Sequence, residues 1–193
     1  SLPAKAVQAL EAALLPRCDL LITSSPAFIR EHFRNRPVKA PIALIENKLL
    51  LDPLDPPAKP IADAPAREGP VTIGWFGMLR CQRTLAFLEN LVNAGDGAIE
   101  VLIAGKPSKA EVPDLPERAQ TKPGLTFHGA YTYADLPELY GRCDFAWSID
   151  WFEEGLNSAW LLPNRLYEAI TYGCVPIALS GVEVGRWLEA EGV

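Results

Sequence analysis

Two arginines that follow an apolar run are the first residues in this sequence that could bind a charged ligand. Residues 74–83 read GWFGMLRCQR, which places Gly77, Arg80 and Arg83 close together. A glycine that allows close backbone approach, the free N–H groups at the start of a helix and two guanidinium groups together suit a diphosphate. The alternative is a plain strand-to-helix turn with solvated arginines. The stretch lacks GxGxxG, so the dinucleotide fingerprint is absent.

A second candidate is the predicted helix over residues 164–172. Asn164, Glu168 and Thr171 share one face of it, at spacings of i, i+4 and i+7. A carboxylate on that face can accept two hydrogen bonds from vicinal hydroxyls such as those of a ribose. The alternative is an ion pair between Arg165 and Glu168 on a solvated face, and the spacing alone favours it.

Residues 147–160 (WSIDWFEEGLNSAW) combine three tryptophans with three carboxylates. Aromatic and amide-rich loops at the end of a strand are typical of sites that bind sugars or other small ligands. Asp150, Glu153 and Glu154 could include a general base, or they could be surface acids around a partly buried aromatic cluster. Both interpretations stay open.

The stretch 127–131 (FHGAY) ends another predicted strand. His128 is expected to be packed or solvated rather than catalytic. The backbone from Gly129 to Tyr131 could face a nucleobase.

The elements that must position these residues alternate regularly after residue 70. Strands that are apolar throughout alternate with amphipathic helices, which predicts a parallel sheet covered on both faces, a Rossmann-like doubly wound α/β fold. In such sheets ligands bind beyond the carboxyl ends of the strands. The predicted strands are 71–76, 99–104, 125–128, 144–149 and 175–179, the predicted helices are 82–93, 134–141, 164–172 and 183–190, and 106–124 is predicted to be a loop.

The first fifty residues predict a smaller α/β unit. A helix over 5–15 precedes a short buried strand at 19–23, a helix from Ser25 to about Phe33 and a second buried strand at 41–46, which together form one β-α-β unit. Six of the 18 prolines lie in residues 52–70, so this stretch is predicted to be a semi-rigid linker. The expected domains are therefore 1–51, the end of an N-terminal domain, and 71–193.

The composition excludes several classes of protein. The 193 residues carry a formal net charge of −6, which argues against nucleic acid as a partner. No apolar run is long enough to cross a bilayer. With two His, four Cys and no CxxC, a zinc site is improbable, and no metal is expected. Cys18, Cys143 and Cys174 adjoin predicted strands, which suits buried thiols in a reducing compartment.

At this point the sequence resembles the retaining glycosyltransferases of the GT-B fold, family 4, and within them bacterial polysaccharide-assembly members. The similar stretches cover almost the whole chain. They are CDLLITSSPAFIREHF, IENK, GWFGMLRCQR, VLIAGKP, LTFHGAY, DLPELYGRCD and, most specifically, LPNRLYEAITYGCVPIA.

The resemblance implies a role for several residues. Glu168 falls on the second Glu of the family's E-x7-E element and would hold the donor's ribose, while Arg83 falls on a diphosphate-binding Lys. The preceding Arg of the family falls on Met78, so Arg80 would have to replace it. The first Glu of E-x7-E falls on Trp160. The other implied donor contacts are Gly77, Gly105, Tyr131, Asn164 and Arg165, with Asn157, Ser158 or Asn164 as substitutes for the first Glu.

The implied reaction moves a sugar with retention from a nucleotide diphosphate-sugar to a glycan or lipid-linked acceptor, without an obligatory metal or other cofactor. Arg80 and Arg83 would stabilise charge on the leaving diphosphate.

The resemblance also implies a cytoplasmic location, at the inner membrane face if the rest of the protein associates peripherally with the membrane. The family's enzymes have two such domains, so this chain is expected to be a fragment with little activity alone. A non-catalytic nucleotide- or sugar-binding module is the alternative; an epimerase or dehydrogenase would need GxGxxG and a Tyr-Lys pair.

Overall fold

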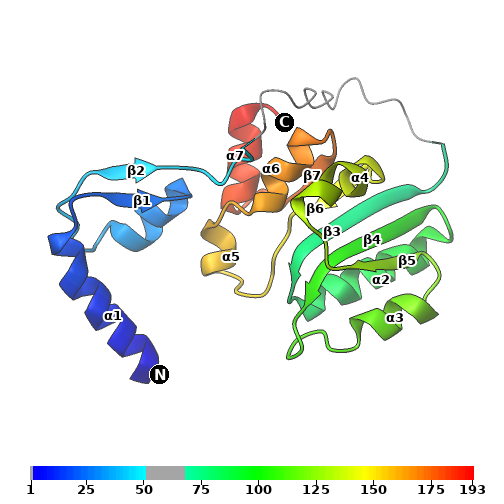
Figure 1. Ribbon diagram of the computed structural model, residues 1–193, viewed down its shortest axis with the longest axis horizontal. Helices are drawn as coiled ribbons and strands as arrows, with labels where there is room; N and C mark the ends of the chain where they lie inside the picture. Colours follow the sequence, from blue (N-terminus) through cyan, green and yellow to red (C-terminus); the bar gives the residue numbers. More distant parts are fainter. Residues whose placement is uncertain (1, 51–67) are drawn as a thin grey trace.

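The chain is centred on a five-stranded parallel sheet with strand order β5-β4-β3-β6-β7. The computed structural model describes residues 2–50 and 68–193 (Figure 1). From β3, the chain adds β4 and β5 on one side and then β6 and β7 on the other. The sheet therefore has a switch point between β3 and β6, where doubly wound folds bind ligands. The strands are β3 (Val71–Leu79), β4 (Ile99–Pro107), β5 (Leu125–Gly129), β6 (Phe145–Trp147) and β7 (Val175–Ile177).

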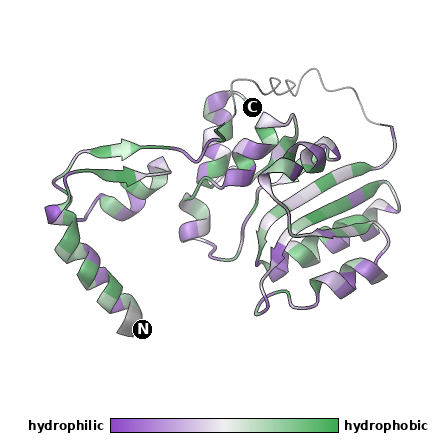
Figure 2. Cartoon of the chain, viewed as in Figure 1, coloured by the Kyte–Doolittle hydropathy of each residue, from purple (hydrophilic) through white to green (hydrophobic). Residues whose placement is uncertain are grey.

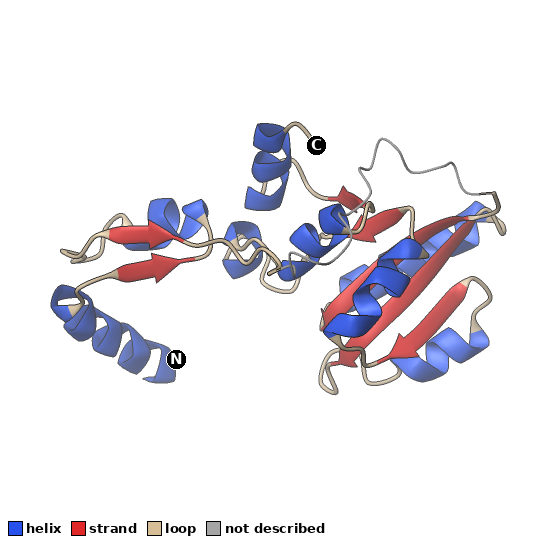
Figure 3. Cartoon of the chain, turned by 45° about the horizontal axis from the view of Figure 1, so that its top comes forward, coloured by secondary structure: helices blue, strands red, loops and turns tan. Residues whose placement is uncertain are grey.

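Helices cover both faces of this sheet, as the apolar strands predict (Figure 3). Successive side chains of a strand point to opposite faces. Trp75 accordingly packs in the cluster that contains α2 and α3, and Phe76 in the one that contains α4 and α6. Figure 2 shows the apolar residues concentrated along the strands. The helices are α2 (Gln82–Gly95), α3 (Leu115–Thr121), α4 (Leu136–Gly141), α6 (Asn164–Thr171) and α7 (Glu183–Glu191). The doubly wound α/β prediction is thus confirmed.

The N-terminal residues form the predicted β-α-β unit. After α1 (Leu2–Leu14) and a 3₁₀ turn (η1, Leu15–Arg17), β1 (Leu21–Thr23) pairs in parallel with β2 (Ile42–Leu44). The connecting helix includes a π-helical segment, η2 (Phe28–Phe33). Ser25 begins it as expected, because its Oγ accepts a hydrogen bond from the Ala27 N–H at 3.2 Å.

Contacts of this unit with the larger sheet domain are polar, aromatic and, at Leu49, aliphatic. Arg30 forms an ion pair with the buried Glu183 at the start of α7. Trp187 Nε1 donates to Glu46 Oε1 at 3.1 Å. Phe28 lies edge-on to Trp160, which belongs to the short helix α5 (Asn157–Trp160). Residues 52–67 of the predicted linker lie outside the described residues, and the domain boundary stays a prediction.

Three sequence expectations about the fold are wrong. The strands at 19–23 and 41–46 are not buried: Ile22 is 57% and Leu44 43% exposed, because among the described strands β1 and β2 pair only with each other. Residues 106–124 are not only a loop, because α3 lies within them: Leu115 and Ala119 are buried four residues apart, and Pro116 is tolerated because it falls in the first turn. Cys18 is exposed, unlike Cys143 and Cys174, because it follows the η1 turn at the surface rather than a buried strand.

Helices long and apolar enough to cross a bilayer do not occur in the described part of the chain.

Candidate functional site

Two facing glycines shape the carboxyl ends of the central strands. Gly77 on β3 is the register partner of Gly105 on β4, and both have positive φ, 106° and 140°. A Cβ on Gly105 would lie 1.9 Å from the carbonyl oxygen of Gly77, so no other residue fits there. The Cβ position of Gly77 instead faces open space, where the nearest described atom is the Tyr131 hydroxyl at 4.0 Å. The backbone of β3 is therefore accessible at Gly77, whereas Gly105 is buried and allows the two strands to approach closely.

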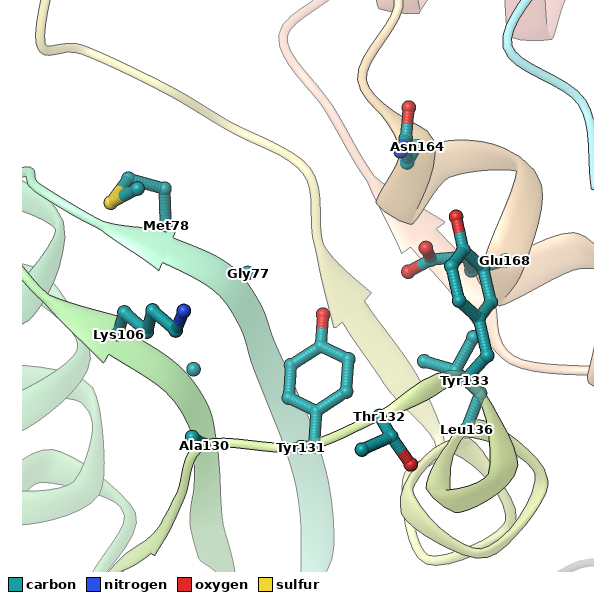
Figure 4. Close-up of a pocket in the computed structure, with 11 residues that line it drawn as sticks. Gly77, Met78, Lys106, Ala130, Tyr131, Thr132, Tyr133, Leu136, Asn164 and Glu168 are labelled. Atoms are coloured by element: carbon teal, nitrogen blue, oxygen red, sulfur yellow. The ribbon is translucent and has the colours of Figure 1, made fainter.

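A cavity of about 290 Å³ lies over these glycines (Figure 4). Two further cavities, of about 610 and 400 Å³, adjoin it and share Asn164 and Glu168 with it. The first is lined by the ends of β3 and β4, the turn after β5 and the start of α6: Gly77, Met78, Gly105, Lys106, Ala130, Tyr131, Thr132, Tyr133, Leu136, Asn164 and Glu168. The predicted face of α6 with Asn164 and Glu168 is therefore directed at the switch point of the sheet.

Glu168 is the buried carboxylate of this site. The residue is 5% exposed, and its Oε2 accepts a hydrogen bond of 2.9 Å from the Tyr140 hydroxyl. Burial raises the pKa of Glu168, against the opposing effects of the Tyr140 hydrogen bond and the nearby charge of Arg165. Arg165 pairs with Asp150 rather than with Glu168. An ion pair on a solvated face therefore does not describe Glu168.

This buried acid predicts a pH dependence of stability. Because its pKa is raised, folded protein binds the Glu168 proton more tightly than unfolded protein does, so the free energy of unfolding should fall as the pH rises from about 4.5 through the folded pKa. The side chain of Glu168→Gln cannot ionise, so this variant should lose the part of the decrease in the free energy of unfolding that Glu168 causes. Urea unfolding at a series of pH values would measure it. Glu117→Gln, at an exposed carboxylate of α3, serves as the control and should follow wild type; parallel curves for wild type and Glu168→Gln would contradict the prediction.

Arg80, Asp150 and Arg165 form a charged cluster in the 400 Å³ cavity. Asp150 Oδ2 lies 3.3 Å from Arg80 Nη2 and 3.9 Å from Arg165 Nη2. Asp150 Oδ1 accepts the backbone N–H of Phe152 at 2.9 Å. Since both carboxylate oxygens are engaged, Asp150 is poorly placed as the general base that the sequence left open.

Arg83 lies outside this cluster. Its side chain is 60% exposed, and its Nη1 pairs with Glu154 Oε2 at 2.8 Å. Its guanidinium also lies 4.4 Å from the ring centroid of Trp151. It does not line the three cavities, although the family resemblance places it at the diphosphate.

Tyr131 brings a phenol to the same space as Glu168. Burial, and then the charge of Glu168, raise the pKa of Tyr131 to about 12, so its hydroxyl stays protonated and can donate a hydrogen bond. Figure 4 shows the Tyr131 hydroxyl and the Glu168 carboxylate directed into one cavity. Within the Gly129–Tyr131 stretch, whose backbone is predicted to face a nucleobase, Ala130 and Tyr131 line this cavity.

Sequence reasoning missed Lys106 and Tyr133, which also line the cavity. Lys106 directly follows Gly105, so its position after a strand-ending glycine was the signal that could have found it. Tyr133 begins a 3₁₀ turn that Thr132 and Asp135 hold through a capping box, and this turn leaves it 70% exposed beside the cavity.

The remaining candidates lie away from the cavities. His128 is exposed, in agreement with its expected solvation. Ser158 is buried, and its Oγ accepts the backbone N–H of Glu153 at 3.2 Å. Trp160, in the place of the first Glu of E-x7-E, contacts Phe28 and accepts a hydrogen bond from Ser25 at its carbonyl oxygen. Of the three suggested substitutes for that Glu, Asn164 lines the cavities and Asn157 and Ser158 do not.

Comparison with known proteins gives one informative similarity. No family model matches the chain. The chain is 42% identical over 193 residues to the succinoglycan biosynthesis protein ExoL of Rhizobium meliloti (strain 1021). The alignment covers 97% of this chain and 47% of that protein, so the chain spans about half the length of the curated relative that it matches.

Proposed function

We propose that this chain is the donor-binding part of a glycosyltransferase that acts in polysaccharide biosynthesis, of the retaining GT-B type, family 4. The observation that carries the proposal is the position of Glu168. It is a buried carboxylate that faces a cavity at the switch point of a doubly wound sheet, beside the end of β3, where Gly77 leaves the backbone accessible. The similarity to a succinoglycan biosynthesis protein supports a role in making a polysaccharide.

In this proposal the nucleotide lies over Gly77 and Gly105. The base would contact the Gly129–Tyr131 backbone and the ribose hydroxyls would donate to Glu168, whose other partner is Tyr140. Asn164 would contact the phosphates or the sugar from the start of α6, where the helix N-terminus favours negative charge. A role for Arg83 at the diphosphate would require its ion pair with Glu154 to open.

The proposed reaction needs no carboxylate nucleophile and no obligatory metal. The acceptor hydroxyl attacks the anomeric carbon from the side of the leaving group. The bond from that carbon to the diphosphate oxygen breaks, and the departing phosphate oxygen takes the hydroxyl proton. Arginine side chains of the site would stabilise the charge that grows on the diphosphate. The acceptor, a glycan or lipid-linked sugar, and a location at the cytoplasmic face of the membrane are proposed for the whole protein.

Calorimetric titration of this chain with UDP, GDP and ADP tests the donor-binding proposal. One nucleotide is expected to bind clearly more tightly than the others, since a single base pocket is proposed. Absence of binding by all three nucleotides would overturn the proposal.

A transfer assay with the whole protein tests the reaction itself. The anomeric configuration of the product, measured by NMR, should be that of the donor, and inversion would contradict the retaining mechanism.

The alternative of a non-catalytic module is favoured by the position of Trp160, which contacts the N-terminal unit rather than the cavities. Nucleotide binding without any transfer by the whole protein would support that alternative.

A further inference from the structure

Two guanidinium groups share one carboxylate oxygen in the cavity of about 400 Å³. Arg80 and Arg165 both approach Asp150 Oδ2, at 3.3 and 3.9 Å. Asp150 is the carboxylate that pairs with both, and the other carboxylate that lines this cavity, Glu168, forms its hydrogen bond with Tyr140 instead. Two guanidinium groups that share a single acceptor oxygen keep hydrogen-bond donors to offer an anion.

The N–H donors of Arg165 are poorly satisfied within the described residues. Its side chain is 12% exposed, its Nη1 donates to the Phe76 carbonyl at a long 3.4 Å, and its buried Nε has no hydrogen-bond partner among the described residues. Burying an unpaired guanidinium N–H is unfavourable, and such groups in native structures call for an explanation beyond stability. Arginine remains charged even where burial lowers its pKa, as it does here.

The elements around Arg165 fix its position. It lies in the first turn of α6, three residues before Glu168, and it contacts β3 at the Phe76 carbonyl. Arg80 follows β3, and its guanidinium lies 4.8 Å from the ring centroid of Phe152. Both guanidiniums reach the same oxygen atom, so they are close enough to contact neighbouring phosphates of one ligand. Planar guanidiniums bind phosphate oxygens in a bidentate manner, which a lysine cannot do.

We propose that Arg165, together with Arg80, binds the diphosphate of the nucleotide-sugar and does the work of the family arginine whose place Met78 occupies in this chain. This inference rests on the proposed function and deepens it, because the resemblance implies only a general donor contact for Arg165. The main phosphate contact then comes from a side chain at the start of α6, whereas the resemblance places that contact at Arg83.

Phosphate-dependent affinity tests this assignment. Dissociation constants are measured by calorimetry for the preferred nucleoside diphosphate, its monophosphate, its nucleoside and inorganic pyrophosphate. The variants are Arg165→Gln, Arg165→Lys and Arg80→Gln. The matched control is Arg118→Gln, because Arg118 on α3 is also a partly buried arginine paired with a carboxylate, Glu89, and does not line the cavities.

Arg165→Gln is expected to weaken diphosphate binding by about 10-fold or more, monophosphate binding less, and nucleoside binding not at all. Arg165→Lys should fall between wild type and Arg165→Gln, and Arg118→Gln should match wild type. A variant with a disturbed fold would weaken all nucleotides alike, so the ratio of diphosphate to monophosphate affinity separates the two effects.

The outcomes also separate this inference from the proposed function. An unchanged ratio in Arg165→Gln, with nucleotide binding by wild type, would overturn the inference alone. Binding of pyrophosphate but of no nucleotide, abolished in Arg165→Gln, would support the anion site and overturn the nucleotide-sugar proposal. Failure of wild type to bind pyrophosphate or any nucleotide would overturn both.

Discussion

Glu168→Gln is expected to weaken binding of the preferred nucleoside diphosphate by about 10- to 100-fold, because hydrogen bonds to a charged acceptor contribute about 1.5–3 kcal/mol. The glutamine keeps the shape of the side chain and can still accept the Tyr140 hydrogen bond of 2.9 Å. The fold should therefore persist, and the effect should be confined to ligand binding. Calorimetric titration of both proteins measures it.

A 2′-deoxynucleotide makes this test specific for the ribose. Wild type should bind the ribonucleotide more tightly than its 2′-deoxy form, because the carboxylate of Glu168 accepts from both hydroxyls. Glu168→Gln should lose most of that preference. Equal preference in the two proteins would mean that Glu168 is a packing residue and does not contact the ribose.

Gly105→Ala is expected to lower the free energy of unfolding by about 3 kcal/mol. The added Cβ would meet the Gly77 carbonyl oxygen at 1.9 Å, so β3 and β4 would have to separate at their carboxyl ends. The φ of 140° adds backbone strain. Because these strand ends form the floor of the cavity, nucleotide binding should weaken as well.

Gly97→Ala separates the collision from the backbone strain. Gly97 also has a positive φ, 84°, but its added Cβ would meet no atom of the described residues within 4 Å. It should cost about 1 kcal/mol, from strain alone. Equal decreases for the two variants in urea unfolding would contradict the close approach of β3 and β4.

The sequence predicted the sheet well because its strands are buried on both faces. A continuous apolar run such as VTIGWF needs no tertiary information to be assigned, and β3 and β4 follow the runs that predict them, extending past them to Leu79 and Pro107. Helix α3 was missed because proline and charged residues mask a buried pair, Leu115 and Ala119. Cys18 was misjudged because neighbouring apolar residues do not show whether a turn lies at the surface.

The site could be predicted only in part. The position of Asn164 and Glu168 on one helix face follows from spacing, and both line the cavities. The hydrogen-bond partner of Glu168, Tyr140, comes from a different helix. The pairing of Arg165 with Asp150 depends on the path of the irregular segment between β6 and α6, which no local pattern encodes. Spacing in the sequence therefore could not identify the side-chain partners of Glu168 and Arg165.

The most direct test of the central claim is a crystal structure of this chain with its preferred nucleoside diphosphate bound. We expect a base beside Tyr131, both ribose hydroxyls within hydrogen-bond distance of the Glu168 carboxylate, and the diphosphate over the Gly77–Gly105 strand ends toward Arg80 and Arg165. A nucleotide bound elsewhere on the chain, or one bound here with its ribose turned away from Glu168, would contradict this expectation.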